Sequence, residues 1–443
     1  MTASFLSFDL DGLGYRMHRL MAELYPICRS ITGEGLRSTL RILQRYIPLQ
    51  VYEIPSGTRV FDWDVPDEWN IRDAYIKGPS GDKVVDFNDS NLHVLQYSLP
   101  TRRKLSLNEL KMHLYSIPEH PDWIPYKTSY YKANWGFCLS HRVLEALPEG
   151  QYEVLIDSSI EPGSLTYGEY LIQGECDEEV LISCHSCHPS LCNDNLSGMV
   201  LAVFLANLLS SEKLHYTYRF LFIPGTIGSI AWLANHANLT HKIKHGLVVA
   251  CVGDSGKPVY KKSRQGDAIV DRAVQHVLQH SGDDFEILEF VPYGYDERQY
   301  CSPGFNLPVG SLTRTPHGQF AEYHTSADNL EFVQAPYLAD SLQKYLKVMQ
   351  VLERNRTYLN THPMCEPQLG RRGLYGVLGG RKDSSLMEMA ILWVLNYSDG
   401  AHSLLEIAET AGLSFDWVYE AAQALMANEL LIQCESVQSM EMS

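Results

Sequence analysis

The feature that most constrains the fold is an alternation of short apolar runs with amphipathic segments between residues 169 and 354. The apolar runs are EVLISC, YRFLFI, GLVVACV, FEILEF and LPVGSLT. Between them lie segments with helical spacing, such as NLSGMVLAVFLANLLSS and the stretch from Pro336 to Arg354. Apolar strands that alternate with helices are typical of a parallel sheet covered on both faces. We therefore expect an α/β protein with a mostly parallel, doubly wound sheet.

Changes in composition divide the chain further. From Val51 to Gly168 it is rich in Tyr, Trp, Pro, Asp and Asn, with short alternating runs such as VYEI, HVLQYSL and QYEVLI. This pattern predicts a β-rich module inserted after the first helices. After a polar stretch at 360–373, three short helical segments follow, and the middle one has the AxxxGL corner of a helix-turn-helix. We assign residues 1–50 and 169–360 to an α/β domain. Residues 51–168 form the inserted β-rich domain, and residues 374–443 form a winged-helix-like domain.

The charge of the chain limits its partners. The formal net charge is -17, which argues against nucleic acid and anionic membranes as main partners. From Tyr375 to Ser443, only Arg381 and Lys382 are basic, against ten acidic residues, which is wrong for a phosphate-binding surface. We therefore expect the last domain to serve packing, a protein partner or homo-oligomer formation, and not DNA.

The sequence also suggests a compartment. The first twenty residues lack a basic segment followed by an apolar one, and no apolar run approaches the roughly 20 residues that span a bilayer. Ten cysteines in a long chain without such a signal are expected to be reduced thiols. We expect a cytoplasmic protein, in which Cys187 of the CHSC run packs beside a ligand rather than binding metal itself.

Polar residues that bind metals follow several of the predicted strands. His185, His188 and Asp194 come after VLISC, and Asp254 ends GLVVACVGD. His324 lies in EYHTSADNL. Because the carboxyl ends of parallel strands meet at one edge, these side chains are expected to share a crevice. Imidazoles and carboxylates are the usual ligands of catalytic zinc, so the sequence predicts a site for one or two Zn²⁺ ions.

Each of these residues also has a structural explanation. Asp194 has the residue type of a helix cap, and Asp254 has that of a turn. The run from His324 to Asp328 is also typical of a helix start. Their occurrence together, in this order and after these strands, favours the metal site.

Several motifs resemble those of known families. CNDNLSG resembles the NDNxSG turn of the M28 zinc aminopeptidases, and HTSAD resembles the setting of their last histidine. More closely, the chain resembles a bacterial aminopeptidase-like family of the DUF4910 type, which carries an inserted β domain and a C-terminal winged helix. That resemblance covers nearly the whole chain. It is carried by RSITGEGLRSTL (29–40), SCHSCHPSLCNDNLSG (183–198), PGTIGSIAWL (224–233) and DERQYCSPGFNLPVGSLTRTPHGQFAEYHTSADNL (296–330).

The M28 resemblance implies roles for the metal-binding residues. Asp194 resembles the bridging carboxylate, His185 the strand-end histidine and His324 the last histidine. Asp254 resembles the terminal carboxylate. His188 has no simple counterpart, and we expect it to be an additional ligand or a substrate contact.

One departure from the M28 pattern affects the catalytic group. Where M28 enzymes carry a Glu-Glu pair, which supplies a general base and a metal ligand, this chain has Phe222, Ile223, Pro224 and Gly225. A single metal ion would then remain, and the base must come from elsewhere. The candidates are Glu297, which we prefer, Asp296 and Glu322. Arg298 is expected to polarise a carbonyl or hold a substrate carboxylate, and Tyr323 to join it in stabilising an oxyanion.

Together these features predict a zinc-dependent hydrolase of amide or peptide bonds, acting on a small peptide or an aminoacylated metabolite. Two alternatives stay open: a non-catalytic scaffold that binds metal or peptide, and mononuclear acyl-transfer or cyclase chemistry. Aromatic residues of the inserted domain would wall the cleft, or form an ordinary core: Trp63, Trp69, Trp123 and Trp135.

Overall fold

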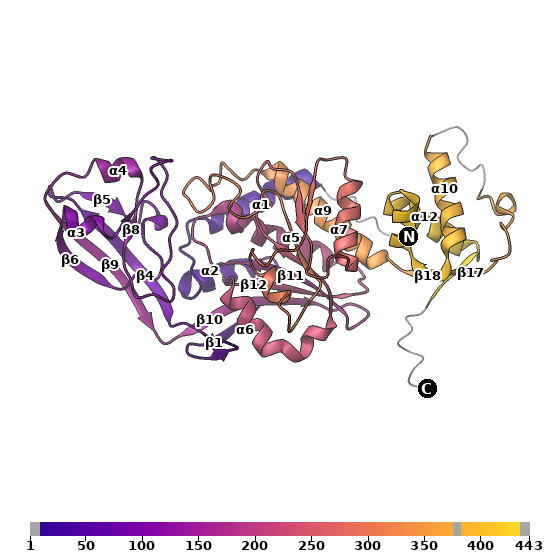
Figure 1. Cartoon of the computed structure of the whole chain (residues 1–443), viewed down its shortest axis with the longest axis horizontal. Coiled ribbons are helices and arrows are strands. Elements are labelled where there is room, and N and C mark those ends of the chain that lie inside the picture. The colour runs from indigo at the N-terminus through magenta and orange to yellow at the C-terminus, as the bar shows by residue number, and fades with distance from the viewer. Residues whose placement is uncertain (1–8, 375–381, 435–443) are drawn as a thin grey trace. The chain divides into compact units, whose positions relative to one another are not determined.

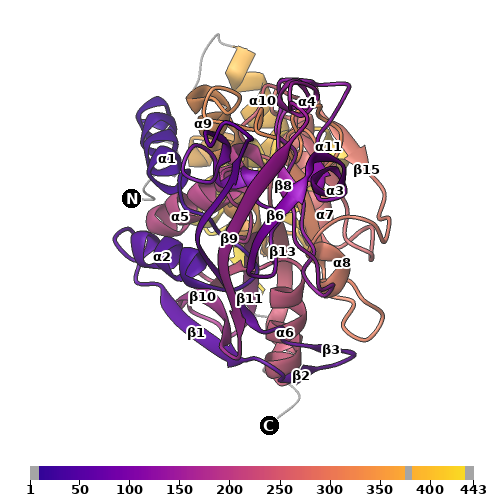
Figure 2. The same ribbon diagram turned by 90° about the vertical axis from the view of Figure 1, so that its left-hand side faces the viewer.

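The computed structural model describes residues 9–374 and 382–434, and Figures 1 and 2 show it from two sides. The chain divides into two compact units. The first holds the chain up to Asp271 together with Asp284–Gln343. The second holds Arg272–Asp283 and the chain from Lys344 onward. We describe each unit by itself.

An eight-stranded sheet forms the centre of the first unit. Its order is β1 (Gln50–Pro55), β10 (Ser164–Ile172), β12 (Thr217–Ile223), β11 (Glu179–His185), β13 (Ile243–Val249), β16 (Val309–Thr313), β14 (Val259–Lys261) and β15 (Glu286–Leu288). The four central strands, β12, β11, β13 and β16, are parallel. This confirms the predicted α/β fold. The sheet is mixed because β10 pairs antiparallel with β12, and β14 pairs antiparallel with β16.

Helices accompany this sheet along the chain. They are α1 (Leu10–Leu24), α2 (Glu34–Leu43), α5 (Gly198–Leu209), α6 (Ile227–His236), α7 (Ile269–Gln279), α8 (Glu297–Tyr300) and α9 (Ala335–Arg354). Helices α7 and α9 each begin in residues of the first unit and end in residues of the second. Helix α5 packs on β11, β12 and β13 and beside α1. It is part of the stretch Cys192–Leu209, which is long and apolar enough to cross a bilayer but is 89% buried inside the protein. We therefore interpret α5 as a core helix.

The inserted β-rich segment lies between β1 and β10. Its four-stranded sheet has the order β5 (Lys83–Asp86), β4 (Glu68–Lys77), β9 (Gln151–Glu161) and β6 (Thr101–Ser106). Shorter elements complete it: β2 (Arg59–Val60), β3 (Trp63–Asp64), β7 (Leu114–Tyr115), β8 (Phe137–Cys138), α3 (Leu107–Lys111) and α4 (His141–Glu145). The predicted limits, Val51 and Gly168, fall within β1 and β10. The run VYEI therefore belongs to the large sheet, where β1 and β10 pair antiparallel.

The aromatic residues of this segment divide between core and surface. Trp69 and Trp135 are buried in a cluster that continues into the α/β fold through Trp232 and Tyr300. Trp63 is 47% exposed. The core explanation thus holds for Trp69 and Trp135, whereas Trp63 is available to line a cleft.

The second unit has helix-turn-helix and wing elements. Its helices are α10 (Lys382–Tyr397), α11 (Leu404–Ala411) and α12 (Phe415–Ala427), and its sheet has the order β18 (Asp399–Ser403), β17 (Thr357–Asn360), β19 (Leu431–Gln433). Ser403 caps α11 in a capping box with Glu406. The three helices were predicted, but the three short strands were not. Of the charged residues counted above, Arg381, Glu435 and Glu441 lie outside the described residues.

Candidate metal and catalytic site

The candidate site lies where the parallel strands of the large sheet end. Strand β11 ends at His185, in register with Ile223 at the end of β12. The segment after β11 then turns through Cys192–Ser197 into α5. The asparagines that flank Asp194 fix this turn. Asn195 donates to the carbonyl oxygens of His185 (3.2 Å) and Val249 (3.0 Å), and Asn193 accepts from the Gly253 amide (3.0 Å).

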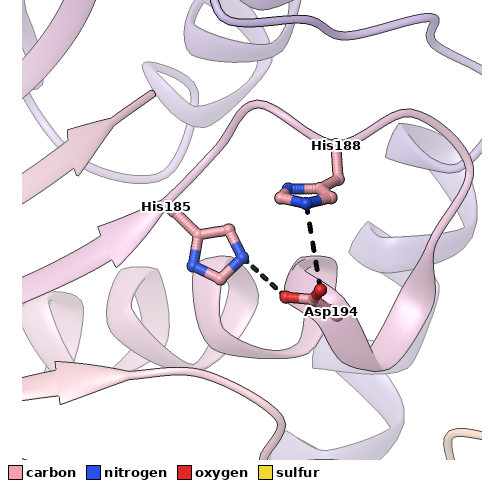
Figure 3. Close-up of side chains that lie close together, drawn as sticks. All are labelled: His185, His188 and Asp194. Carbon is pink, nitrogen blue, oxygen red and sulfur yellow. Dashed lines mark hydrogen bonds and ion pairs between the residues drawn. The ribbon is translucent and has the colours of Figure 1, made fainter. Parts of the chain in front are cut away.

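Four histidines surround the carboxylate of Asp194. His185 Nε2 lies 2.6 Å from Asp194 Oδ1, and His324 Nε2 lies 3.0 Å from Asp194 Oδ2. His188 Nε2 lies 3.9 Å from Oδ2, and Figure 3 shows both His185 and His188 pointing at this carboxylate. His317 Nδ1 lies 3.8 Å from Oδ1. The structure therefore brings together four of the five predicted metal-binding residues, together with His317.

Burial and charge set the protonation of this cluster. Asp194, His185 and His188 are at most 6% exposed. Burial by itself would raise the pKa of Asp194, but the His188 and His185 imidazoles and the hydrogen bonds from His185 and His324 hold that pKa well below its usual range. Burial lowers the pKa of His188 well below that of a free imidazole. A charged carboxylate beside a neutral imidazole is the form in which both bind a cation.

Two residues of the cluster were not predicted. His317 stands in the TPHGQF part of the long family motif, and its buried Nε2 has no hydrogen-bond partner. Cys251 follows β13, and its sulfur lies 3.5 Å from His317 Nδ1. Asp194, Cys251 and His317 form a second group whose donor atoms all lie within 4.8 Å of one another. The available signal for His317 was a second histidine in the long motif that also carries His324.

Asp254 lies outside both groups of candidate donors that the described residues form. Its carboxylate accepts hydrogen bonds from the Asn193 side chain (2.7 Å), the Thr315 hydroxyl (2.6 Å) and the Gly256 amide (2.7 Å). These contacts fit the turn explanation, so we leave Asp254 out of the ligand set proposed below. Cys251, three residues earlier, stands closer to the end of β13 and reaches the cluster instead.

Asp328, the last residue of HTSAD, joins the two halves of the site. Its Oδ1 accepts from the Asn193 amide (2.6 Å) and its Oδ2 from the Asp194 amide (3.0 Å). Burial raises the pKa of Asp328 to about 8, although these backbone donors oppose the rise. Asp328 therefore positions the Asp194 turn against the segment that carries His324.

The backbone of His188 is also held in place. Arg29, which is fully buried, donates from Nε to the His188 carbonyl oxygen (2.8 Å) and from Nη1 to the Leu24 carbonyl oxygen (2.7 Å). The inserted segment contributes Tyr126, whose ring centroid lies 5.1 Å from that of His188 and 5.0 Å from that of His324. No sequence signal distinguished Tyr126 from the other tyrosines.

The predicted base candidates have different surroundings. Glu297 is 2% exposed, pairs with Lys261 and accepts from the Tyr295 amide (3.1 Å), so both of its oxygens are engaged. Asp296 is fully buried and accepts from the Ser229 hydroxyl (2.7 Å) at Oδ1, while Oδ2 has no partner. Burial raises the pKa of Asp296 to about 6, against the influence of nearby His185. Among the described residues, Asp296 thus has a carboxylate oxygen without a partner, whereas Glu297 is held in an ion pair.

Two tyrosine rings flank the histidines. Tyr323 stacks on His324 with 3.9 Å between ring centroids. Tyr295, which the sequence analysis did not single out, lies 3.9 Å from the His185 ring. A Cβ at position 225 would come within 2.0 Å of the Tyr295 ring. The Tyr295 ring therefore fills the space beside Gly225, where M28 enzymes were expected to carry an acidic side chain. Glu322, the remaining base candidate, lies two residues before His324, and its carbonyl oxygen accepts from Thr325. In the described part of the chain its side chain forms no hydrogen bond or ion pair with the cluster.

A cavity of about 380 Å³ opens beside His188 and His324. The same cavity is lined by Tyr295 and Arg298 from the α/β fold and by aromatic rings of the inserted segment. A second cavity, of about 520 Å³, is lined by Tyr25, Trp69, Asn91 and neighbours, and none of the four histidines contributes to it. Of these two cavities, the one beside the cluster is the one that adjoins the candidate metal-binding residues.

Comparison with known proteins identifies the family of the chain. The model of DUF4910, a domain of unknown function, matches residues 18–355, and a winged helix-turn-helix model matches residues 356–433. The chain belongs to the DUF4910 family. It is 53% identical, over 94% of its length and 96% of the relative, to a Clostridium acetobutylicum protein named for polysaccharide biosynthesis and an aminopeptidase-like domain.

The chain is also similar to proteins of known structure. A crystal structure from Clostridium acetobutylicum, described as that of a candidate peptidase, has a TM-score of 0.92 and 51% identity, covering 96% of this chain and 98% of that chain. A zinc aminopeptidase from Bacillus subtilis has a TM-score of 0.58 at 12% identity, covering 78% of this chain and 95% of that chain. An M28 peptidase precursor from Shewanella amazonensis has a TM-score of 0.53 at 14% identity, with coverage of 78% and 96%. The two distant neighbours establish an aminopeptidase-like fold.

The residues present fit a transition-metal ion. His185, His188 and Asp194 each offer a donor atom within 4.8 Å of the others, and all three are buried. Two or three imidazoles with one carboxylate are the donor set of catalytic zinc sites. His317 adds a further imidazole, whose Nδ1 lies 3.8 Å from Asp194 Oδ1. Burial raises the pKa of Cys251 well above its usual value, so its thiol would bind only after a cation displaced the proton.

Proposed function

We propose that this protein is a zinc-dependent hydrolase that cleaves an amide bond in a small peptide or an aminoacylated metabolite. The observation that carries the proposal is the fully buried Asp194 carboxylate with four imidazoles within 4 Å of it. Burying so many polar groups together costs free energy unless a cation binds them. The proposed ligands are Asp194, His185, His188 and His324, with His317 as an addition.

The protein's own residues have distinct tasks in this proposal. A bound zinc ion would polarise the scissile carbonyl and lower the pKa of water to about 7. Asp296, with its free Oδ2, would accept and return the proton, a role that the sequence analysis preferred for Glu297. Tyr323 would face the developing negative charge. Asn193, Asn195 and Asp328 hold the Asp194 turn so that the ligands need not reorganise.

Zinc content and turnover test the proposal together. We expect the protein, purified without chelators and supplied with zinc, to hold about one zinc ion per chain and to release amine from a panel of short peptides and aminoacyl amides. Asp194→Asn should lose zinc and turnover while keeping its fold by circular dichroism. Lys213→Gln, at an exposed lysine paired with Glu175 far from these residues in sequence, is the control variant. Zinc binding without turnover on any amide would instead support the scaffold alternative.

A further inference from the structure

The cavity beside His188 and His324 has an unusual balance of charge. Its walls are aromatic or aliphatic on most sides, and Trp63, Tyr126, Tyr130, Tyr131, Ile227 and Ile230 are among the described residues that line it. Among these described residues, no carboxylate lines the cavity, and Arg298 is the single guanidinium or ammonium group. An ammonium group of a substrate would find no counter-charge among them, whereas an anion would.

Arg298 lies near the Asp296 carboxyl, whose pKa burial raises and the charge of Arg298 lowers. It forms no hydrogen bond or ion pair with the part of the chain that the structure describes, and its Nε is buried without an acceptor. Its neighbours in sequence are engaged differently, since Glu297 pairs with Lys261 and Asp296 accepts from Ser229. A buried donor without an acceptor costs free energy, so a ligand that supplies an acceptor at Arg298 gains that energy on binding.

The shape and size of the cavity limit the anion. A volume of about 380 Å³ admits a small molecule. Trp63 and Tyr131 are 47% and 53% exposed, and their rings lie 5.4 Å apart. Exposed aromatic rings of this kind favour an apolar or aromatic group in the ligand. One guanidinium among apolar walls matches a single negative charge, and its planar fork matches a carboxylate.

We propose that Arg298 binds a free carboxylate of the substrate, and that the aromatic wall of the cavity binds an apolar or aromatic side chain next to it. The substrate class is therefore a short peptide or acylated amino acid with one free carboxylate close to the scissile amide. This inference rests on the proposed hydrolase function and makes it more specific, because the end of the substrate that enters the cavity is anionic.

Binding of two matched probes tests the proposal without turnover. 3-Phenylpropionate and 3-phenylpropionamide have the same ring and chain and differ in charge. Calorimetric titration of the zinc-loaded full chain should give about 30-fold tighter binding for the carboxylate. Arg298→Gln should remove that preference, and Arg298→Lys should restore part of it. Arg264→Gln, at an arginine that bonds to Asn306 on the exposed surface, should leave it unchanged.

Three results would overturn the proposal: equal binding of the two probes, no binding of either, or a preference that Arg298→Gln retains. The last result would mean that the carboxylate binds the metal ion instead. The turnover panel gives a separate readout, in which wild type should prefer N-acetylated dipeptides with a free carboxylate over the same dipeptide amides. If no amide is cleaved, the hydrolase proposal fails, and the two-probe titration still decides the role of Arg298.

Discussion

At the scale of single residues, Gly225 and Tyr295 mark how this protein departs from the M28 pattern. The space that a side chain at 225 would need is filled by the Tyr295 ring. We expect Gly225→Ala to lower the free energy of unfolding by about 2 kcal/mol, because overpacking forces the ring or backbone to move. Denaturant unfolding of Gly225→Ala, Tyr295→Ala and the double variant measures this. In the Tyr295→Ala background, Gly225→Ala should lower the free energy of unfolding by much less. An unchanged effect of Gly225→Ala would show that the Tyr295 ring is not what the new side chain meets.

The neighbouring carboxylates Asp296 and Glu297 should respond differently to loss of charge. Asp296→Asn should lower kcat by about 100-fold or more with zinc retained, because it removes the proposed proton acceptor. Glu297→Gln should instead lower the free energy of unfolding by about 3 kcal/mol, because it leaves Lys261 without its buried partner. Steady-state kinetics and denaturant unfolding on both variants separate the two roles. The reverse pattern would restore Glu297 as the base.

At the residue level, the side chains that the structure brings together include those that the sequence marked by both a motif and a strand end. His185, Asp194 and His324 were found this way because each follows or faces the edge of a parallel strand. Cys251 was missed because the sequence analysis looked for a carboxylate after β13 and chose Asp254. Tyr126 and Arg29 were missed because their contacts with His188 join distant parts of the chain, which spacing alone does not encode.

At the scale of elements, α12 of the second unit depends on a histidine. The Phe415 amide donates to His276 Nε2 (3.0 Å), and burial lowers the pKa of His276 to about 4. Because the folded pKa lies below the unfolded value of about 6.5, the unfolded chain binds the proton first as the pH falls. The contribution is complete above about pH 6.5 and is lost as the pH falls toward 4.

The stability of the second unit should therefore depend on pH to a degree that can be measured. Between pH 7.5 and pH 4, protonation of His276 should cost the second unit about 3 kcal/mol of stability. Hydrogen exchange of the α12 amides across this pH range, corrected for intrinsic rates, reports it. His276→Gln keeps an acceptor for the Phe415 amide and does not titrate, so its profile should be flatter than that of wild type. Equal slopes in the two proteins would contradict the assignment.

The elements themselves were predicted unevenly. Long apolar runs such as β11 and β12 and the helices α5 and α9 were predicted, because burial on both faces or a strong helical period leaves little choice. Strand β14 and the three strands of the second unit were missed, since segments of three to five residues take their conformation from the strand they pair with. Strand β1 was assigned to the inserted segment because pairing with β10 is not visible in its own sequence.

At the scale of the whole molecule, the two compact units should respond differently to metal. All the proposed zinc ligands lie in the first unit. A ligand that binds only the folded state raises the stability of the unit that holds it. Calorimetry of the full chain should therefore show one transition that moves to lower temperature with a chelator and one that does not. Equal movement of all transitions would show that the units unfold together or that zinc binds elsewhere.

The central claim is that His185, His188, His324 and Asp194 meet around a metal ion. Anomalous scattering on both sides of the zinc absorption edge, from crystals of protein purified without chelators, tests this most directly. We predict a peak about 2 Å from Asp194 and from at least two of these imidazoles. Crystals that diffract well and show no zinc peak among these side chains, even after zinc is supplied, would contradict the claim.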